Sequence, residues 1–338
     1  MKVLVTGNLG YVGQVLTSKL IEKNYQVIGY DVGFYQYELQ KIDNLNITIK
    51  KDIRNIVESD LKDCSAILHL AALSNDPLGE INSSLTHEIN FLSTIRLAQM
   101  AKKIGIERFI YSSSCSTYGM NDETVDENSS LAPITAYAKS KVESEIELIK
   151  MKSDNFHPII LRNATAYGFS KSLRLDIVVN NLTASAYSTG SVKLMSDGTS
   201  WRPLIHVKDM AKAFIMCLDS DVSKVSGEIF NVGSNAENYT VKQIAETVNE
   251  IVPNSKIEFE KNASKDSRSY RVNFDKIKKV LGFTNDWTIN NGIKQIFDEL
   301  KKQNFTEKDF KDKKFFRVAY IKWLLENKII DTNLRFNP

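Results

Sequence analysis

The stretch of sequence that decides the fold is Thr6-Gly7-Asn8-Leu9-Gly10-Tyr11-Val12-Gly13. It follows a short strand-like run at residues 2–6 and leads into a segment of helical periodicity. In such a unit the first glycine permits a tight turn, the second lets the backbone approach a pyrophosphate, and the third allows a helix to pack closely on a strand. The helix N-terminus then offers N–H groups to phosphates. Glycines alone also fit an ordinary turn, but their position between a strand and a helix favours a dinucleotide site.

Strand and helix patterns alternate from this loop through the first half of the chain. The first helix carries Val12, Val15, Leu16 and Leu20 on one face, a spacing that packs against a sheet. Strands are expected at residues 2–6, 26–30, 47–50, 66–70, 109–112 and 158–161, and later helices near 84–104 and 137–151. Because parallel strands need right-handed crossovers, this order predicts an α/β fold with a Rossmann-type, doubly wound parallel sheet and a ligand crevice at the strand C-termini.

The pattern loosens after Gly168. We expect a helix at residues 176–188, a short strand at 192–195, and strand with loop in the polar stretch 254–269. We predict two parts: a dinucleotide-binding domain over residues 1–168 and a smaller C-terminal substrate-binding lobe over 169–338. Segments near 205–233 are expected to return to the first domain. The segment 315–325 is expected to pack on the body through Phe315, Ala319, Tyr320 and Trp323 rather than to bind a membrane or a partner.

The composition is that of an ordinary soluble globular protein, with 42% hydrophobic and 25% charged residues. Its 44 Lys and Arg against 41 Asp and Glu give a net charge of +3, too small to indicate nucleic-acid binding. No apolar run suits a bilayer span, and the first strand begins too early for a signal peptide. The three cysteines show neither disulfide nor zinc-site spacing. We therefore expect a cytoplasmic protein with no metal and with neither a nucleic acid nor a membrane as partner.

Asp31 ends the second predicted strand, at the distance from the glycine loop that suits an adenosine ribose. A carboxylate there accepts hydrogen bonds from the ribose hydroxyls and repels a 2′-phosphate. No Arg or Lys is adjacent to it in sequence, so NAD is predicted rather than NADP. The alternative is that Asp31 only caps a turn with Gly33.

Tyr137-Ala138-Lys139-Ser140-Lys141 places Tyr137 and Lys141 one turn apart on one face of a predicted helix. A nearby ammonium group is expected to lower the tyrosine pKa towards a value useful for proton transfer at neutral pH. The pair also fits an exposed helix. However, Ser112-Ser113-Ser114 at a strand end can hydrogen-bond a reacting hydroxyl or carbonyl, and the two motifs together favour a proton-transfer site.

Taken in order, these motifs resemble the extended short-chain dehydrogenase/reductase family, in its NAD-dependent nucleotide-sugar epimerase/dehydratase branch, which includes UDP-galactose 4-epimerase. The resemblance covers nearly the whole chain. It rests on the glycine loop, Leu70-Ala71-Ala72, Ser112-Ser113-Ser114-Cys115-Ser116-Thr117-Tyr118-Gly119, the Tyr137/Lys141 pair, Asn180-Asn181-Leu182, Asp197-Gly198-Thr199 through Arg202, Ile205-His206-Val207-Lys208-Asp209 and Leu281-Gly282-Phe283.

The resemblance implies a role for each matching residue. Tyr137 would be the general base, Lys141 would bind the nicotinamide ribose, and Ser114 would share the hydrogen bond to the reacting oxygen. The implied NAD site comprises Gly7, Leu9, Gly10, Tyr11, Val12, Gly13, Asp31, Asp52, Ile53, Leu70, Ala71, Ala72, Asn90, Tyr137 and Lys141. The implied site for a nucleotide-diphosphate sugar comprises Ser114, Cys115, Ser116, Tyr137, Asn163, Arg174, Asn181, Leu182, Arg202 and Arg268. His206 is interpreted as structural, and a homodimer is implied.

Departures from the family pattern bear on the reaction. The 4,6-dehydratases carry Asp and Glu after the catalytic hydroxyl residue, where this chain has Cys115 and Ser116, and this disfavours dehydration. Thr165 stands where epimerases carry a phosphate-binding Asn. The hypothesis favoured is NAD-dependent oxidation at C4 by an epimerase of surface polysaccharide biosynthesis. The run 173–180 resembles GDP-heptose 4-dehydrogenases, so a dehydrogenase or ketoreductase that releases a 4-keto sugar is the alternative. A non-catalytic NAD sensor is least favoured, because Tyr137 and Lys141 are both present.

Overall fold

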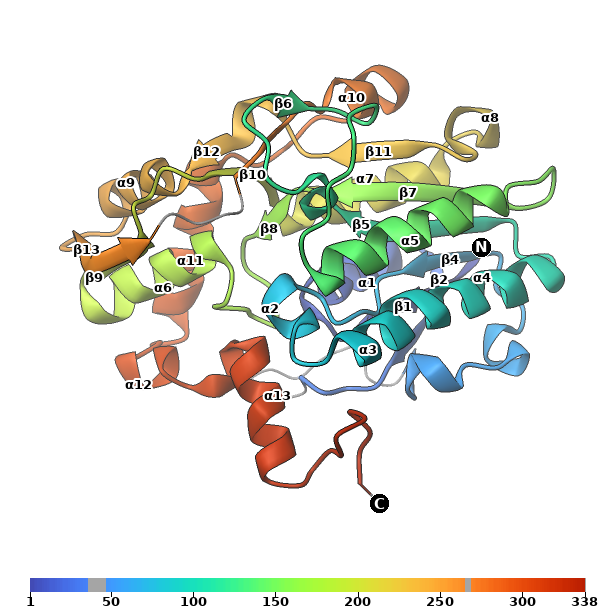
Figure 1. Cartoon of the computed structure of the whole chain (residues 1–338), viewed down its shortest axis with the longest axis horizontal. Coiled ribbons are helices and arrows are strands. Elements are labelled where there is room, and N and C mark those ends of the chain that lie inside the picture. Colours follow the sequence, from blue (N-terminus) through green and yellow to red (C-terminus); the bar gives the residue numbers. More distant parts are fainter. Residues whose placement is uncertain (36–46, 265–268, 338) are drawn as a thin grey trace.

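A seven-stranded sheet forms the centre of the computed structural model, which describes residues 1–35, 47–264 and 269–337 (Figure 1). The strand order is β11-β7-β5-β4-β1-β2-β3, and all neighbours are parallel. The strands are β1 (Lys2–Thr6), β2 (Gln26–Asp31), β3 (Thr48–Lys50), β4 (Ala66–His69), β5 (Arg108–Ser114), β7 (His157–Asn163) and β11 (Ile229–Val232). Each of the six strands expected in the first half is present, and the predicted doubly wound parallel sheet is confirmed.

Helices cover both faces of this sheet because alternate strand residues point to opposite sides. Val3 and Val5 share one buried cluster with α1 (Tyr11–Glu22) and α7 (Val207–Asp219). Leu4, between them in sequence, belongs to the cluster on the other face, with α4 (Ser93–Lys103) and α5 (Ala136–Lys150). The core therefore lies in two layers, one on each side of the sheet.

The helix expected at residues 84–104 is divided into three consecutive pieces. These are α3 (Ser83–Thr86), a π-helical stretch η4 (His87–Leu92), and α4. Wide π turns of this kind often occur at functional sites, and this one contains Asn90. Helix α5 begins where expected, with Thr135 as its N-cap: the Thr135 hydroxyl accepts a hydrogen bond from the Ala138 N–H at 3.1 Å.

The second half builds a smaller lobe around a separate buried cluster. A three-stranded sheet, β12-β10-β8, and a parallel pair, β13-β9, form its strands. The larger elements are β8 (Thr165–Tyr167), α6 (Val178–Thr189), β9 (Ser191–Ser196), β10 (Trp201–His206), β12 (Asn238–Thr240), α9 (Val241–Ile251), β13 (Lys256–Ser264) and α11 (Ile289–Lys302). Between them, α7 packs on α1 and β11 pairs with β7, so this part of the chain returns to the central sheet.

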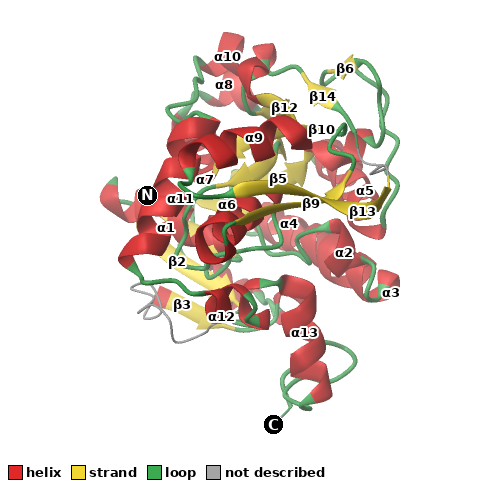
Figure 2. Cartoon of the chain, turned by 90° about the vertical axis from the view of Figure 1, so that its left-hand side faces the viewer, coloured by secondary structure: helices red, strands yellow, loops and turns green. Residues whose placement is uncertain are grey.

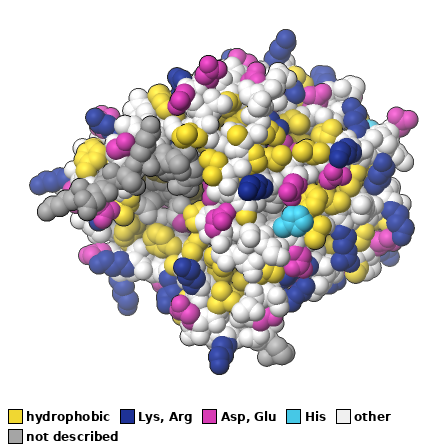
Figure 3. All heavy atoms as spheres, viewed as in Figure 1, with side chains coloured by type: hydrophobic (Ala, Val, Ile, Leu, Met, Phe, Trp, Pro, Cys, Tyr) yellow, Lys and Arg dark blue, Asp and Glu magenta, His cyan; other side chains and the backbone are white. Residues whose placement is uncertain are grey.

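Shorter elements connect these parts. They are η2 (Ile53–Asn55), η3 (Glu58–Leu61), α2 (Asp76–Gly79), η5 (Cys115–Tyr118), β6 (Thr124–Val125), α8 (Val222–Val225), η6 (Asn235–Glu237), β14 (Arg271–Val272), α10 (Asp275–Leu281), α12 (Glu307–Phe310) and η7 (Lys313–Phe315). Among the described residues, no helix combines the length and apolarity that a membrane span requires. Figure 3 shows side chains of both charge signs interspersed over one face of the molecule.

Helix α13 (Arg317–Glu326) follows η7 and lies at the edge of the molecule opposite α10 in both views (Figures 1 and 2). Its buried positions are Arg317, Ile321 and Leu324. The predicted stripe is therefore partly wrong, since Ala319 is exposed although Phe315 is buried. These three residues are spaced i, i+4 and i+7 and form the helix face that contacts the body. Because the first of them is an arginine, the apolar pattern of the sequence does not include it.

Candidate active site

One large cavity opens at the C-terminal ends of the central strands. Its volume is about 1270 Å³, and its lining joins the glycine loop, the start of α5, residues of α6, and the first residues of α13. Pockets for a single small ligand usually measure about 300–1,000 Å³. The cavity is therefore large enough for a cofactor and a substrate side by side.

The glycine loop forms the floor of this cavity at the N-terminus of α1. Gly7 has a positive φ of +72°, and a Cβ on Gly13 would lie 2.0 Å from the Gly7 carbonyl oxygen. Both positions therefore exclude a side chain. Gly10 is the N-cap of helix α1 and has no side chain to cap it, which leaves the N–H groups of the first turn to a ligand. This geometry suits a pyrophosphate.

Asp31 is the last residue of β2 and lies beside the glycine loop, where the adenosine is expected. Its carboxylate accepts hydrogen bonds from the Leu9 N–H at 3.0 Å and from the Gly33 N–H at 2.8 Å, and it lines the cavity. Burial raises the pKa of this carboxyl, and the two N–H donors act in the opposite direction. Asp31 thus caps the turn at Gly33 and also faces the cavity, so the two interpretations of this residue are compatible.

The other residues expected to bind the cofactor fall into two groups. Leu9–Gly13, Asp52, Ile53, Leu70, Ala71 and Ala72 all line the cavity. Asn90 does not line it: the Asn90 amide oxygen accepts from the Leu73 N–H at 2.8 Å, and its amide nitrogen donates to the Leu73 carbonyl at 3.2 Å. Asn90 therefore holds the backbone at Leu73 and does not reach the cavity in which it was expected to bind the cofactor.

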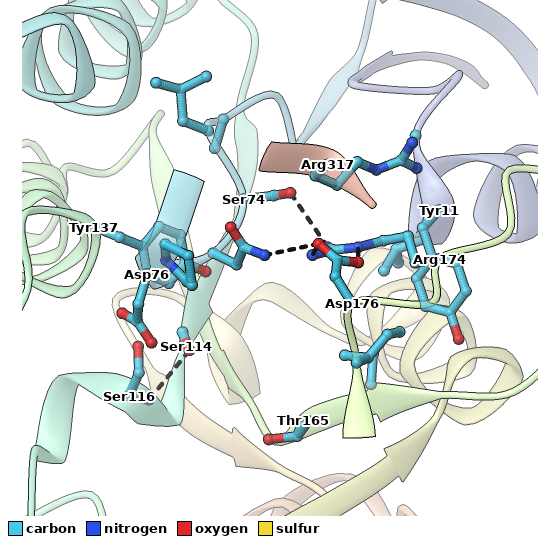
Figure 4. A pocket seen from close by; sticks show the side chains of 18 of the residues that line it. Tyr11, Ser74, Asp76, Ser114, Ser116, Tyr137, Thr165, Arg174, Asp176 and Arg317 are labelled. Carbon is cyan, nitrogen blue, oxygen red and sulfur yellow. Dashed lines mark hydrogen bonds and ion pairs between the residues drawn. The ribbon is translucent and has the colours of Figure 1, made fainter. Parts of the chain in front are cut away.

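Ser114, Tyr137 and Lys141 line the cavity at the end away from the glycine loop. Figure 4 shows Ser114 and Tyr137 there, across from Tyr11. Ser114 ends β5, while Tyr137 and Lys141 lie on the first turns of α5. The Lys141 ammonium donates to the Ser112 carbonyl at 2.7 Å and lies 5.6 Å from the centroid of the Tyr137 ring. Gly79 of α2 packs so closely that a Cβ there would lie 3.0 Å from the Tyr137 Cβ. The tyrosine is therefore held from two sides.

The pKa values at this end differ from the prediction. Burial, and next the Asp76 carboxylate, raise the pKa of Tyr137, while a hydrogen bond with Ser114 acts in the opposite direction. Burial lowers the pKa of Lys141 to about 7. The expectation that Lys141 lowers the tyrosine pKa is wrong for the chain alone, because Lys141 is buried, Tyr137 is partly buried, and burial disfavours the charged form of each.

Most residues expected to bind substrate border the catalytic end of the cavity. Ser116, Asn163, Arg174, Asn181, Leu182 and Arg202 line it. Cys115 does not, because its thiol is fully buried and donates to the Arg162 carbonyl at 3.1 Å. Arg268 lies outside the described residues. The Asn163 Oδ1 and the Ser116 hydroxyl are buried without a hydrogen-bond partner in the described chain, so both are placed to bind a ligand.

Asp76 is a site residue that the sequence motifs did not reveal. It starts α2, and its carboxylate accepts a hydrogen bond from the Thr135 hydroxyl at 2.5 Å. Figure 4 shows this carboxylate beside Ser116 and Tyr137. The Asn75-Asp76-Pro77 run is a helix-start signal that could have located α2, but only the docking of α2 on α5 brings the carboxylate to the site.

An ion pair separates the catalytic end from the glycine loop. Arg174 binds Asp176 through two parallel contacts, Nε to Oδ1 at 2.8 Å and Nη2 to Oδ2 at 2.9 Å. Ser74 and Asn75, next to Asp76, hydrogen-bond the two partners at 3.3 and 3.0 Å. The segment before α2 thus links the ion pair to the catalytic helix.

A phosphate-binding loop, an acidic residue at the end of β2 and a Tyr/Lys pair at one cavity define a nucleotide-cofactor-dependent enzyme of the Rossmann type. Residues 3–233 match the model of the NAD dependent epimerase/dehydratase family, and the chain belongs to this family. The cofactor is accordingly NAD, which the glycine loop and Asp31 fit.

Relatives in the family differ in the reaction that their names state. The chain is 29% identical over 316 residues to a putative UDP-glucose 4-epimerase of Methanocaldococcus jannaschii, covering 90% of this chain and 100% of the relative. It is 24% identical over 321 residues to UDP-glucuronic acid decarboxylase 1 of Arabidopsis thaliana, covering 92% and 72%. The structure of an NAD-dependent NDP-hexosamine 5,6-dehydratase, TunA, superposes with a TM-score of 0.79 at 19% identity, over 89% of this chain and 98% of that one. The last likeness concerns the fold alone.

Proposed function

We propose that the protein oxidises C4 of the sugar in a nucleotide-diphosphate sugar and returns the hydride to the same carbon, as an epimerase of surface polysaccharide biosynthesis. The observation that carries the proposal is the meeting of Ser114, Tyr137 and Lys141 in a cavity large enough for both ligands. Similarity to a putative UDP-glucose 4-epimerase over 90% of the chain supports it.

Side chains of the protein would remove the proton from the sugar oxygen and later return it. When bound, NAD supplies the hydride acceptor, and its positive ring favours the phenolate form of Tyr137. Tyr137 would take the proton of the C4 hydroxyl, and the Ser114 hydroxyl would hydrogen-bond the same oxygen. Because burial holds the tyrosine pKa high, Tyr137 would also return that proton readily when the ketone is reduced.

Binding of the substrate diphosphate is assigned to two arginines and an amide. Arg174, Asn181 and Arg202 line the cavity beyond the catalytic residues, and arginine forks suit phosphate oxygens. The Asn163 Oδ1, which lacks a partner among the described groups, would accept a hydrogen bond from the sugar or from the cofactor amide. A homodimer is proposed on the family resemblance.

Two other outcomes use the same residues. A 4-dehydrogenase would release the 4-keto sugar, and the run Leu173–Asn180, whose Arg174 and Asp176 line the cavity, keeps this alternative open. Dehydration was disfavoured because Cys115 and Ser116 replace two carboxylic acids. Asp76, however, brings a carboxylate to the catalytic end from α2, so the comparison of residues 115 and 116 does not by itself decide against elimination.

A substrate carrying deuterium at C4 separates these reactions. We expect screening of UDP-, GDP-, CDP- and dTDP-sugars to identify the nucleotide, and the C4 inverted product to keep its deuterium in ordinary water. Turnover that requires an added keto acid such as 2-oxoglutarate would contradict epimerisation and establish a dehydrogenase. A product lighter by one water, with deuterium at C6, would establish a 4,6-dehydratase.

A further inference from the structure

The C-terminal segment, defined here as residues 313–337, folds back onto the adenosine end of the cavity. Phe336 packs on Phe34 with ring centroids 5.5 Å apart, and Tyr320 packs on Tyr35 at 6.0 Å. Near its end, the Leu334 carbonyl accepts from the Arg54 guanidinium at 3.5 Å. These contacts flank Asp52 and Ile53, so this segment forms part of the wall around the expected adenine position.

Arg317 is a buried, charged residue of this segment that lines the cavity. It starts α13, is only 2% exposed, and lines the same cavity as the glycine loop. Its Nη2 donates to the Ser172 hydroxyl at 2.9 Å, and its guanidinium lies 3.8 Å from the centroid of the Tyr35 ring. A hydroxyl on one side and an aromatic face on another hold the guanidinium in one position.

The charge of Arg317 acts on both carboxylates that border the phosphate region. Its charge favours the ionised form of Asp31, where burial nevertheless raises the pKa, and it acts with Arg174 to lower the pKa of Asp176. Burying a guanidinium is costly unless negative groups surround it. The chain thus keeps a desolvated positive charge close to the Arg174–Asp176 pair (Figure 4).

The path of a dinucleotide passes this point. With the adenosine ribose at Asp31 and the nicotinamide ribose at Lys141, the pyrophosphate lies at the N-terminus of α1. The two arginines border that region from different elements. Arg174 acts on Tyr11, the first residue of α1, and Arg317 acts on Asp31, which binds the Leu9 N–H.

We propose that Arg317 binds the pyrophosphate of NAD, and that the C-terminal segment is a component of the cofactor site. The helix N-terminus then neutralises the phosphates from one side and a guanidinium from another. The inference depends on NAD as cofactor and not on which sugar reaction follows.

The test compares ligands that have or lack the pyrophosphate. Cofactor-stripped protein is titrated calorimetrically with ADP-ribose and with adenosine, using wild type, Arg317→Met and Arg317→Lys. Methionine keeps the packing of the side-chain stem without the charge. A hydrogen bond to a charged group contributes about 1.5–3 kcal/mol. Arg317→Met should therefore lower the affinity for ADP-ribose roughly 10- to 100-fold and change the affinity for adenosine by no more than about twofold.

The control is Lys328→Met, from the same segment. Lys328 is exposed and does not line the cavity, so its loss should change both affinities little. Equal weakening of adenosine and ADP-ribose by Arg317→Met would overturn the proposal, because it would mean that Arg317 only docks the segment. Unchanged ADP-ribose binding would overturn it as well. If Arg317→Met does not fold, Arg317→Lys provides the test. A loss of affinity for ADP-ribose but not for adenosine supports the contact, and the absence of such a selective loss contradicts it.

Discussion

The two ends of the cavity are built in different ways. At the catalytic end, Ser114, Tyr137 and Lys141 come from one strand and the following long helix, within 28 residues of chain. At the adenosine end, Asp31 and Tyr35 meet Arg317, nearly 300 residues later in sequence. A site made by neighbouring elements depends on local geometry, whereas a site closed by a distant segment depends on docking. Substitutions at the two ends should therefore separate chemistry from cofactor retention.

Tyr137→Phe should have the largest effect. Removing the general base should lower turnover by roughly 10²–10⁴-fold while NAD stays bound, because the adenosine end is untouched. Steady-state kinetics and the NAD content of the purified variant measure the two quantities. Ser114→Ala serves as the milder comparison and should reduce turnover less. Near wild-type turnover in Tyr137→Phe would exclude the proposed mechanism.

Lys141→Met should change how the stability of the cofactor-free protein depends on pH. Between pH of about 7 and 10.5, the native lysine is neutral while the unfolded one is charged, so the unfolded chain binds one more proton. The wild-type unfolding free energy should therefore rise relative to that of Lys141→Met by up to about 1.4 kcal/mol per pH unit over this window. Urea unfolding at a series of pH values measures the difference. Lys139→Met, at an exposed position of α5, should show no such slope.

Asp31→Ala should narrow the preference for NAD over NADP by about tenfold or more, because the alanine removes a carboxylate that repels the 2′-phosphate and a tenfold change in affinity corresponds to about 1.4 kcal/mol. Arg317 would then stand near the added 2′-phosphate without an opposing carboxylate at residue 31. Titration with both cofactors measures the preference. Asp31→Asn keeps an acceptor for the Leu9 or Gly33 N–H and separates loss of charge from loss of the turn. An unchanged preference in both variants would refute the role of Asp31 in selection.

Asp76→Asn should have the smallest effect. Because the Asp76 carboxylate raises the pKa of Tyr137, its removal should move the ascending, low-pH limb of the kcat/KM profile, on which the general base loses its proton, to lower pH by less than about one unit. Glu80→Gln is the matched control, an exposed carboxylate on the same segment that binds the Ala136 N–H. A shift to higher pH would show that Asp76 acts on the reaction in some other way.

The same contrast explains what the sequence could predict. Three features can be predicted from the sequence because each depends on residues within one turn or one strand end. They are the glycine loop, Asp31 and the Tyr137/Lys141 pair. The strands of the first half were placed within two residues for the same reason.

Residues fixed by long-range packing were not predictable in this way. Asp76 reaches the site only because α2 docks on Thr135, and Arg317 lies on a helix face that lacks an apolar signal at that position. Burial also decides two further points that a linear motif does not contain. The Cys115 side chain turns inward at the start of η5, and the pKa of Tyr137 is raised rather than lowered.

The return of the C-terminal segment to Phe34, Tyr35 and Arg54 also sets an order of events during translation. The ribosome makes β1, β2 and the glycine loop long before residues 313–337, and domains generally begin to fold from the N-terminal side as they emerge. The nascent chain can thus assemble its first βαβ unit with the adenosine end still uncovered. Cofactor can enter from that open side early, and the wall that contains Arg317 forms behind it only once synthesis has passed α13.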